Sequence, residues 1–178
     1  RDFIARSIET DRDFLRAHDP ERDRADFEAA WQARADGAAG EVNAFEPNYE
    51  GSPVVAGPWP DHAPGGSAVG QHDFQARAGH HLAPASLSDG RNVYQALGPG
   101  FSLLALGADP ASVAAFEAAA AALGLPLQVL LDDAGGERQR YGARLVLVRP
   151  DQFVAWSGSE GLSAETAQAL LAQASGRA

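Results

Sequence analysis

FSLLALGADPASVAAFEAAAAALGLPLQVLL, residues 101–131, has the pattern of a strand, a helix and a second strand. Its first six residues are almost continuously apolar, as in a strand that is buried on both faces. Asp109-Pro110 suits the start of the helix, and Gly124 suits its end. Such a unit nearly always forms a parallel, right-handed crossover. The residues expected on the inner edge of the helix are Val113, Phe116, Glu117, Ala120 and Leu123.

The residues toward the C-terminus predict an antiparallel hairpin and a last helix. The β-rich runs at 144–148 and 153–156 are separated by the turn sequence Arg-Pro-Asp-Gln at 149–152. Ser163 suits the N-cap of a helix that ends near Gly176. The order strand, helix, three strands, helix is that of a minimal thioredoxin core. We therefore predict an α/β, thioredoxin-like domain with a mixed sheet flanked by helices. The residues expected to face inward from the last helix are Ala167, Leu170, Leu171 and Ala174.

Three short stretches around this core are interpreted as turns. Residues 87–94 contain Asp-Gly and predict a β-hairpin. Residues 98–100, Gly-Pro-Gly, are only G-x-G and precede a strand, so they do not form a dinucleotide-binding fingerprint. Residues 132–140 are polar, and the Asp132-Asp133 pair is expected to be a solvated turn rather than a site of paired carboxylates.

The chain divides into a helical arm (1–45), an irregular connection (46–84) and the thioredoxin-like domain (85–178). The arm should hold two helices, the second capped at Asp19-Pro20 and running to about Gly37. Either the arm packs on its own domain or it docks on a partner domain upstream, and we favour the partner. The apolar stripe of the first helix comprises Phe3, Ile4, Ile8, Phe14 and Leu15. One side of the second helix carries Phe27, Ala30, Trp31 and Arg34.

The connection is rich in proline, glycine and histidine and has few periodic signals, so it is not expected to be a core element. Residues 52–55 could form one short extended piece. Its aromatic residues indicate that parts of it lie against a surface. These aromatic residues are Tyr49, Trp59 and Phe74.

Composition restricts the function classes. A net charge of −10 opposes binding to phosphate backbones, so no nucleic-acid partner is expected. The chain has no cysteine, which excludes disulfides, thiolate metal sites and dithiol chemistry. No apolar run approaches the roughly 18 residues of a membrane span. We expect a cytoplasmic protein without a membrane partner, and the initial Arg1 indicates a piece of a longer chain.

The redox determinants of a thioredoxin are missing. Its Cys-x-x-Cys motif would stand at residues 107–110, which are Gly-Ala-Asp-Pro here. The proline that faces those cysteines is absent from residues 141–143, which are Tyr-Gly-Ala. The other candidate site is a histidine group in the connection. Because its spacing fits no closed motif, surface or loop histidines are favoured over a metal site. The group comprises His62, His72, His80 and His81, with Asp61 and Asp73 nearby.

Three motifs together resemble a known family: LSDGR at 87–91, LGPGFSLL at 97–104, and LVLVRPDQ at 145–152 followed by VAW at 154–156. They are similar to the C-terminal domain of phenol-hydroxylase-like, class A flavin monooxygenases over about residues 48–176. Local departures include Ser157, where relatives often have arginine. Residues 1–45 would correspond to the helices that follow the flavin-binding domain of such enzymes.

The resemblance implies that the parent enzyme is an aromatic hydroxylase that uses FAD, NAD(P)H and O₂ on a phenolic substrate. It also implies a flavin-binding domain as partner and leaves room for a homodimer. For this chain alone we expect no activity, no catalytic residue, no cofactor-binding residue and no metal site. The predicted function is therefore a non-catalytic structural and interaction domain. The alternative is a stand-alone, redox-inactive, thioredoxin-like binding module.

Overall fold

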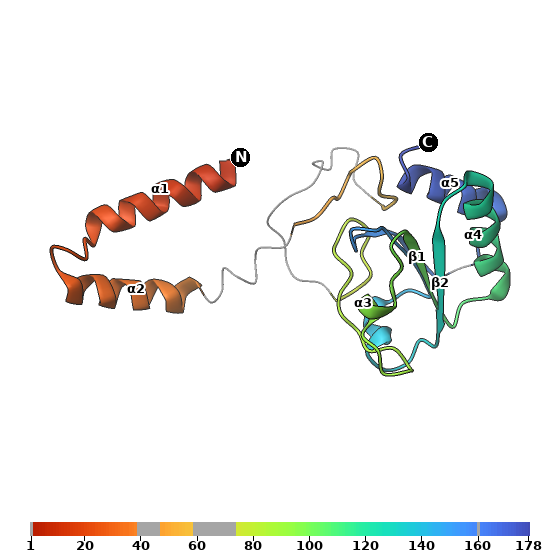
Figure 1. The fold of residues 1–178 in the computed structure, drawn as a ribbon, viewed down its shortest axis with the longest axis horizontal. Coiled ribbons are helices and arrows are strands. Elements are labelled where there is room, and N and C mark those ends of the chain that lie inside the picture. The colour runs from red at the N-terminus through yellow and green to blue at the C-terminus, as the bar shows by residue number, and fades with distance from the viewer. Residues whose placement is uncertain (1, 39–46, 59–73, 160) are drawn as a thin grey trace. The chain divides into compact units, whose positions relative to one another are not determined.

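The structure is a computed structural model that describes residues 2–38, 47–58, 74–159 and 161–178. The chain forms two compact units, a helical arm and an α/β domain (Figure 1). None of the described helices is long and apolar enough to cross a membrane.

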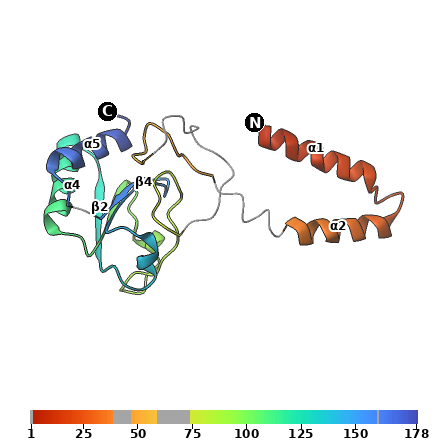
Figure 2. The ribbon, with the colours of Figure 1, turned by 180° about the vertical axis from the view of Figure 1, so that it is seen from behind.

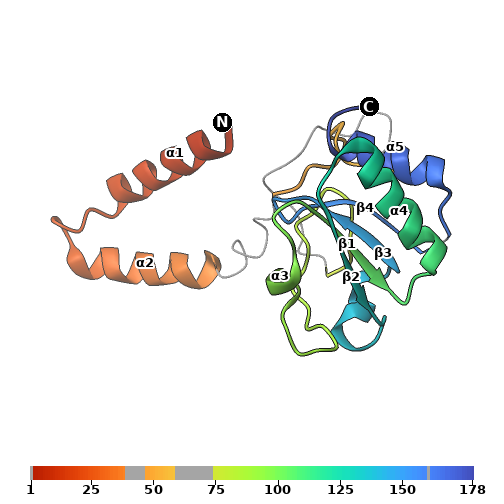
Figure 3. The same ribbon diagram turned by 45° about the vertical axis from the view of Figure 1, so that its right-hand side comes forward.

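A four-stranded mixed sheet forms the centre of the α/β domain, in the order β2-β1-β3-β4 (Figure 3). β1 runs parallel to β2 and antiparallel to β3, and β3 and β4 form an antiparallel hairpin with an irregularity at Leu147/Val148. The predicted mixed α/β sheet is thus confirmed, whereas the assignment to the thioredoxin fold in particular stays a prediction. The strands are β1 Phe101–Leu106, β2 Leu127–Asp132, β3 Leu145–Val148 and β4 Val154–Gly158.

Two helices cover one face of the sheet, α4 (Pro110–Leu123) and α5 (Ala164–Ala174), and they pack side by side (Figures 1 and 2). Asp109 and Ser163 are their N-caps, as predicted, and Gly124 ends α4 with φ 62°. The buried residues of α4 include Val113, Phe116 and Ala120. Glu117 is exposed, so its prediction as an inner residue was wrong. The helical turn of about 100° per residue carries it past Phe116 and away from the core.

The opposite face of the sheet is covered mainly by irregular chain. Its helical pieces are short, α3 (Val93–Ala96) and the 3₁₀ helix η2 (Gly136–Tyr141). The connection contributes to this core: Ala76, Leu82 and Ala83 are buried together with Leu104 and Val146 of the sheet. The connection is therefore irregular, as expected, but it is not excluded from the core. The hydrophobic periodicity of the sequence did not indicate this burial, because these side chains lie in irregular chain and not in a helix or strand.

The predicted β-hairpin at residues 87–94 is only partly formed. Gly90 makes the tight turn with φ 84°, and a single bridge joins Ser86 to Asn92. The chain then enters α3 because the Asn92 side chain accepts a hydrogen bond from the Tyr94 N–H at 3.1 Å. The Gln95 side chain in turn accepts one from the Asn92 N–H. This local capping prevents a second strand.

The predicted extended piece at residues 52–55 is instead a turn, closed by the Val55 N–H donating to the Ser52 carbonyl at 3.0 Å. Tyr49 does lie against the domain, with its ring 4.7 Å from that of Phe153. Phe74 stacks under the Arg140 guanidinium. Trp59 lies outside the described residues.

The arm consists of α1 (Asp2–Ala17) and α2 (Arg24–Ala38). The second helix begins later than predicted, because Asp23 accepts hydrogen bonds from the N–H groups of Ala25 and Asp26. Asp19 forms a turn with the Glu21 N–H and does not cap the helix.

An aromatic cluster joins the two helices of the arm. Phe14 of α1 contacts Phe27 and Trp31 of α2, with ring centroids 6.0 and 5.9 Å apart. The Arg34 guanidinium lies over the Phe14 ring. The other members of the stripe are separated from this contact: Ile8 and Leu15 are 46% and 51% exposed. The side chains of Phe3 and Ile4 lie outside the described residues.

Candidate binding and docking site

At residues 107–110, where a thioredoxin would carry its dithiol, the side chain at the start of α4 is already hydrogen-bonded within the helix. The Asp109 carboxylate accepts from both the backbone N–H and the hydroxyl of Ser112, at 3.0 and 2.5 Å. These two bonds hold the pKa of Asp109 below its usual range. The Ser112 hydroxyl also accepts a hydrogen bond from the Leu162 N–H at 2.9 Å. The start of α4 therefore carries a fixed negative charge and, at Pro110, lacks one N–H donor.

A flavin or nicotinamide pyrophosphate does not fit this helix end. Such a group is normally held by several backbone N–H groups at a helix N-terminus. Here the Asp109 carboxylate already occupies that position. Residues 98–100 supply no second candidate, because they pack closely against the start of β2. A Cβ on Gly98 would come within 2.5 Å of the Gln128 side chain, and one on Gly100 within 2.7 Å of the Pro126 carbonyl oxygen.

The segment at residues 141–143 lies in a different hollow from the start of α4. Tyr141 is buried, and its hydroxyl donates to the Ala83 carbonyl at 2.6 Å. Burial raises the pKa of Tyr141 far above its ordinary value, so the phenol stays protonated at neutral pH. It serves as an anchor for the irregular face of the domain.

The candidate histidine group does not converge where the structure describes it. His80 is nearly buried, and its Nε2 lies 2.9 Å from a Glu50 carboxylate oxygen that also contacts Arg77. His81 points elsewhere and packs against Phe153 and Tyr94. His62 and His72, with Asp61 and Asp73, lie outside the described residues. No group of three metal-ligating side chains occurs among the residues that were described.

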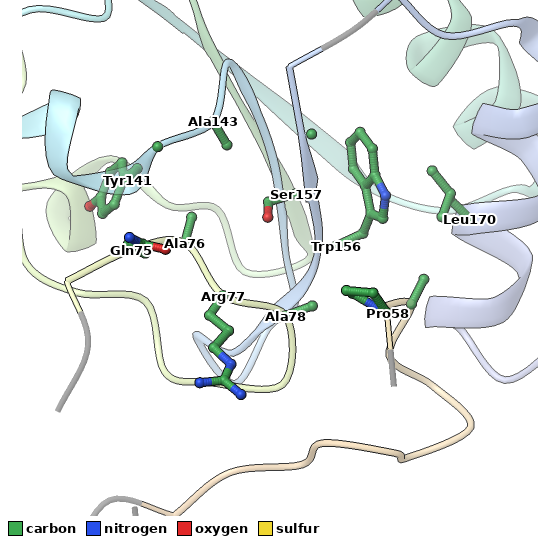
Figure 4. A pocket seen from close by; sticks show the side chains of 14 residues that line it. Pro58, Gln75, Ala76, Arg77, Ala78, Tyr141, Ala143, Trp156, Ser157 and Leu170 are labelled. Atoms are coloured by element: carbon green, nitrogen blue, oxygen red, sulfur yellow. The ribbon is translucent and has the colours of Figure 1, made fainter. Parts of the chain in front are cut away.

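A cavity of about 520 Å³ lies beside β4 (Figure 4). Trp156 and Leu170 form one side of it, and Tyr141 and Ala143 lie on the other (Figure 4). Ser157 and Arg77 provide polar groups, but Arg77 is already paired with Glu50.

Glycine is required at the end of β4 because the Trp156 indole lies across it. A Cβ on Gly158 would come within 2.4 Å of the indole ring. The indole ring also contacts the Phe116 ring, with the two ring centroids 5.9 Å apart. The cavity therefore has a rigid aromatic wall and polar groups that can orient a ligand. Among the described residues, its lining contains no nucleophile paired with a base.

Arg138 is the main polar feature that sequence reasoning missed. It is only 7% exposed, and its guanidinium contacts both Asp132 and Asp133, at 3.3 and 2.6 Å. It also donates to the Ser86 carbonyl at 2.5 Å. It thereby joins the end of β2, the loop before α3 and η2. No sequence signal marked Arg138, because it lies in a stretch of polar residues typical of a solvated turn.

Asp132 is therefore not solvated, contrary to prediction, although Asp133 is exposed. Burial by itself raises the pKa of Asp132, but hydrogen bonds from Ser88 and the charge of Arg138 lower it overall. The hydrogen bond from Arg138 lowers the pKa of Asp133. Both carboxylates are thus ionised in the folded protein at neutral pH and act structurally.

Residues 75–178 match the family model described as aromatic-ring hydroxylase, C-terminal. The chain is 38% identical over 104 residues to the FAD-dependent monooxygenase apdD of Emericella nidulans, covering 55% of this chain and 16% of that protein. It is 46% identical over 54 residues to the FAD-dependent monooxygenase opdD of Penicillium oxalicum, covering 29% of this chain and 10% of that protein.

Solved structures of other proteins are similar to this chain over a larger share of its length. The substrate-free rebeccamycin biosynthetic enzyme RebC is 29% identical to this chain, with a TM-score of 0.64. The match covers 93% of this chain and 30% of the RebC chain. Aklavinone-11 hydroxylase, in a ternary complex with FAD and aklavinone, is 26% identical with a TM-score of 0.58, covering 75% of this chain and 26% of its own. This chain thus spans less than a third of each of these proteins.

Proposed function

Because this chain belongs to the aromatic-ring hydroxylase C-terminal domain family, as the match over residues 75–178 shows, we propose that it is the non-catalytic structural and interaction part of an FAD-dependent aromatic-ring hydroxylase. The observation that carries the proposal is the start of α4. Asp109 and Pro110 stand there in place of a redox dithiol and leave no cradle for a pyrophosphate.

The parent reaction in this proposal is the NAD(P)H- and O₂-dependent hydroxylation of a phenolic substrate. FAD is implied by the relatives, which are FAD-dependent monooxygenases. The flavin, the nicotinamide and the aromatic ring would be held by domains outside these 178 residues. This chain would supply surfaces that pack against them.

We assign residues 1–45 to an arm that follows the flavin-binding domain, 46–84 to the connection and 85–178 to the C-terminal domain. The exposed Ile8 and Leu15 of α1 and the exposed Trp31 of α2 give the arm an apolar surface for that partner domain. A cytoplasmic location is part of the same proposal.

Equilibrium dialysis against FAD tests the division of labour. We expect the isolated chain to retain no flavin and to stay colourless, while the parent enzyme retains it stoichiometrically and is yellow. The variant Asp109→Ala serves as a control, because it removes the carboxylate without supplying the missing N–H donors and should also stay colourless. A yellow complex of micromolar or better affinity with the isolated chain would overturn the proposal.

The alternative, a stand-alone and redox-inactive binding module, is favoured by one observation, the cavity beside β4. The intact mass of the native polypeptide separates the two functions. A mass near 18.6 kDa, that of these residues alone, supports the stand-alone module. A mass about three times larger supports the parent hydroxylase.

A further inference from the structure

Irregular chain covers the outer side of the edge strand β4 at Val154 and Ala155. The Val154 N–H donates to the His80 carbonyl at 2.9 Å, and the Val154 carbonyl accepts from the Gly79 N–H at 2.8 Å. The Ala155 carbonyl accepts from the Ala56 N–H at 2.8 Å. A further strand could pair along this part of β4 only by displacing these contacts.

Two residues beyond Ala155, the main chain of Ser157 faces the same outer side. The Gly158 carbonyl faces β3, because it accepts from the Arg144 N–H at 3.1 Å. Main-chain groups alternate in direction along a strand, so the N–H and C=O of Ser157 point away from β3. Among the described residues, these two groups and the Ser157 hydroxyl form no hydrogen bond. Ser157 thus presents one main-chain donor and one main-chain acceptor side by side.

The main chain of Ser157 opens into the cavity of about 520 Å³ beside β4. Pockets of this volume typically hold small molecules, between apolar walls and a few polar groups that fix the orientation of the ligand. The Trp156 indole supplies an apolar wall next to Ser157 (Figure 4). Its contacts with Gly158 and Phe116 fix the plane of the ring. A flat aromatic ligand suits such a wall, because aromatic rings pack favourably against one another.

The charges around the cavity favour a neutral ligand. Arg77 is the only charged residue of the described lining. Its guanidinium is already paired with the Glu50 carboxylate at 2.5 Å, and it points away from Ser157 and Trp156 (Figure 4). An ionised ligand beside Ser157 would therefore lose its hydration without gaining an opposite charge, which is costly.

We propose that the cavity beside β4 binds an uncharged, planar aromatic carboxamide. The ring lies against the Trp156 indole. The amide N–H donates to the Ser157 carbonyl, and the amide oxygen accepts from the Ser157 N–H, so that one group satisfies both. A carboxylate lacks the donor, and an extended peptide would clash with the chain that covers Val154 and Ala155. The proposal does not depend on which of the two functions above holds.

Isothermal titration calorimetry of the full chain with 2-naphthamide tests the proposal. We expect one site per chain and a dissociation constant of about 0.1 mM or lower, in keeping with the size of the ligand. The control ligand is 2-naphthoate, which keeps the rings but has no donor and carries a negative charge. It should bind at least about tenfold more weakly. Equal affinity for the two compounds, or no binding of 2-naphthamide, would contradict the proposal.

Variants of Ser157 separate its main chain from its side chain. Ser157→Pro removes the outward N–H but no hydrogen bond of the sheet, and edge strands tolerate proline at such positions. It should weaken the binding of 2-naphthamide by about fivefold or more. Ser157→Ala keeps the N–H and should bind almost as the unmodified chain does. An equal loss in both variants would show that the hydroxyl is the partner and that the assigned contact is wrong.

The aromatic wall is tested by Trp156→Leu, which should weaken the binding of 2-naphthamide by about tenfold. Trp31→Leu is the matched control, because Trp31 is exposed on the arm, and it should leave the affinity unchanged. Circular dichroism of each variant shows whether the fold is kept. A folded Trp156→Leu variant with unchanged affinity would place the ligand elsewhere.

The chain itself is the competing occupant of the cavity, because the lining residues Pro58 and Gln75 flank residues 59–73. A variant in which a glycine-serine linker of equal length replaces residues 59–73 tests this. We expect it to bind 2-naphthamide with the same affinity as the unmodified chain. Binding that appears only in this variant would overturn the proposal.

Discussion

At Arg138 one buried guanidinium joins three segments of the α/β domain that no regular element connects. Buried ion pairs contribute little compared with a well-packed apolar replacement, but removal of one partner leaves the other charge buried and uncompensated. Asp132 is the charge that would be left here, with its side chain 5% exposed.

The variant Arg138→Ala should therefore lower the free energy of unfolding by about 3 kcal/mol. Urea denaturation followed by circular dichroism measures this. Arg149→Ala is the control, because Arg149 pairs with Asp151 in a more exposed turn and should cost less than about 1 kcal/mol. Equal losses for the two variants would show that Arg138 does not hold the segments together.

Position 79 requires glycine for two reasons, its left-handed backbone conformation and the lack of room for a Cβ atom. Its φ is 83°, and a Cβ there would come within 2.9 Å of the Glu50 backbone nitrogen. Gly90 has almost the same φ, 84°, but nothing lies within 4 Å of the position of a Cβ. The two glycines therefore separate the cost of a left-handed backbone from the cost of a clash.

The variant Gly90→Ala should destabilise the domain by about 1 kcal/mol, the cost of the left-handed conformation for a residue with a side chain. Gly79→Ala should cost clearly more, because the backbone of the segment around Glu50 must also move. Thermal denaturation of both variants compares them. A Gly79→Ala variant as stable as Gly90→Ala would mean that this segment does not pack as described.

Among the elements, those with complete local signals were predicted and those decided by distant contacts were not. β1, α4 and α5 have apolar runs or helical periodicity together with caps at Asp109 and Ser163. α3 was missed because a four-residue helix shows no periodicity, although the Asn92 capping box defines it. The edge position of β2 could not be predicted, since strand order depends on pairing and not on the composition of one strand.

The candidate site was less predictable than the elements for the same reason. Arg138 and Asp132 meet Ser86 and Ser88 only after the chain has folded back by some 50 residues. The cavity beside β4 likewise draws its lining from five separate stretches. The predicted hydrophobic stripe of the arm mixed two faces of α1, because Phe14 faces α2 whereas Ile8 and Leu15 do not.

This division of α1 leads to a prediction about the arm. Phe14→Ala should reduce the helical signal of the arm, because it removes the contacts to Phe27 and Trp31 that join the helices. Leu15→Ala should leave the signal almost unchanged, since alanine favours helix and Leu15 is half exposed. Circular dichroism at 222 nm on the full chain measures both. A larger loss for Leu15→Ala would place the inter-helix contact on the other face.

Five carboxylates of the α/β domain have pKa values below their ordinary range. Hydrogen bonds from neighbouring groups lower the pKa of Asp89, Asp109 and Asp133, with the same net direction for Asp132 and Glu137. A carboxylate whose folded pKa is below its unfolded value binds fewer protons in the folded state. Its contribution is present above the unfolded pKa and is lost as the pH falls through the folded pKa.

The free energy of unfolding should therefore be nearly constant above about pH 5 and should fall steeply below about pH 4. Denaturant titrations at a series of pH values measure this. Arg138→Ala should flatten the acid slope, because the pKa of Asp133 depends first on Arg138. Stability that rises on acidification would show that these carboxylates are destabilising.

The irregular face of the domain has a consequence for synthesis on the ribosome. Leu82 and Val93 are fully buried, but the strands they cover, β1, β3 and β4, are translated later. Val154 of β4, which closes this part of the core, follows Leu82 by about 70 residues. At a translation rate of about 5–20 residues per second, these apolar side chains are synthesised several seconds before the strands that bury them. In a nascent chain that pauses before β4 is synthesised, Leu82 and Val93 would therefore be exposed. We expect chaperones to bind the nascent chain at these residues.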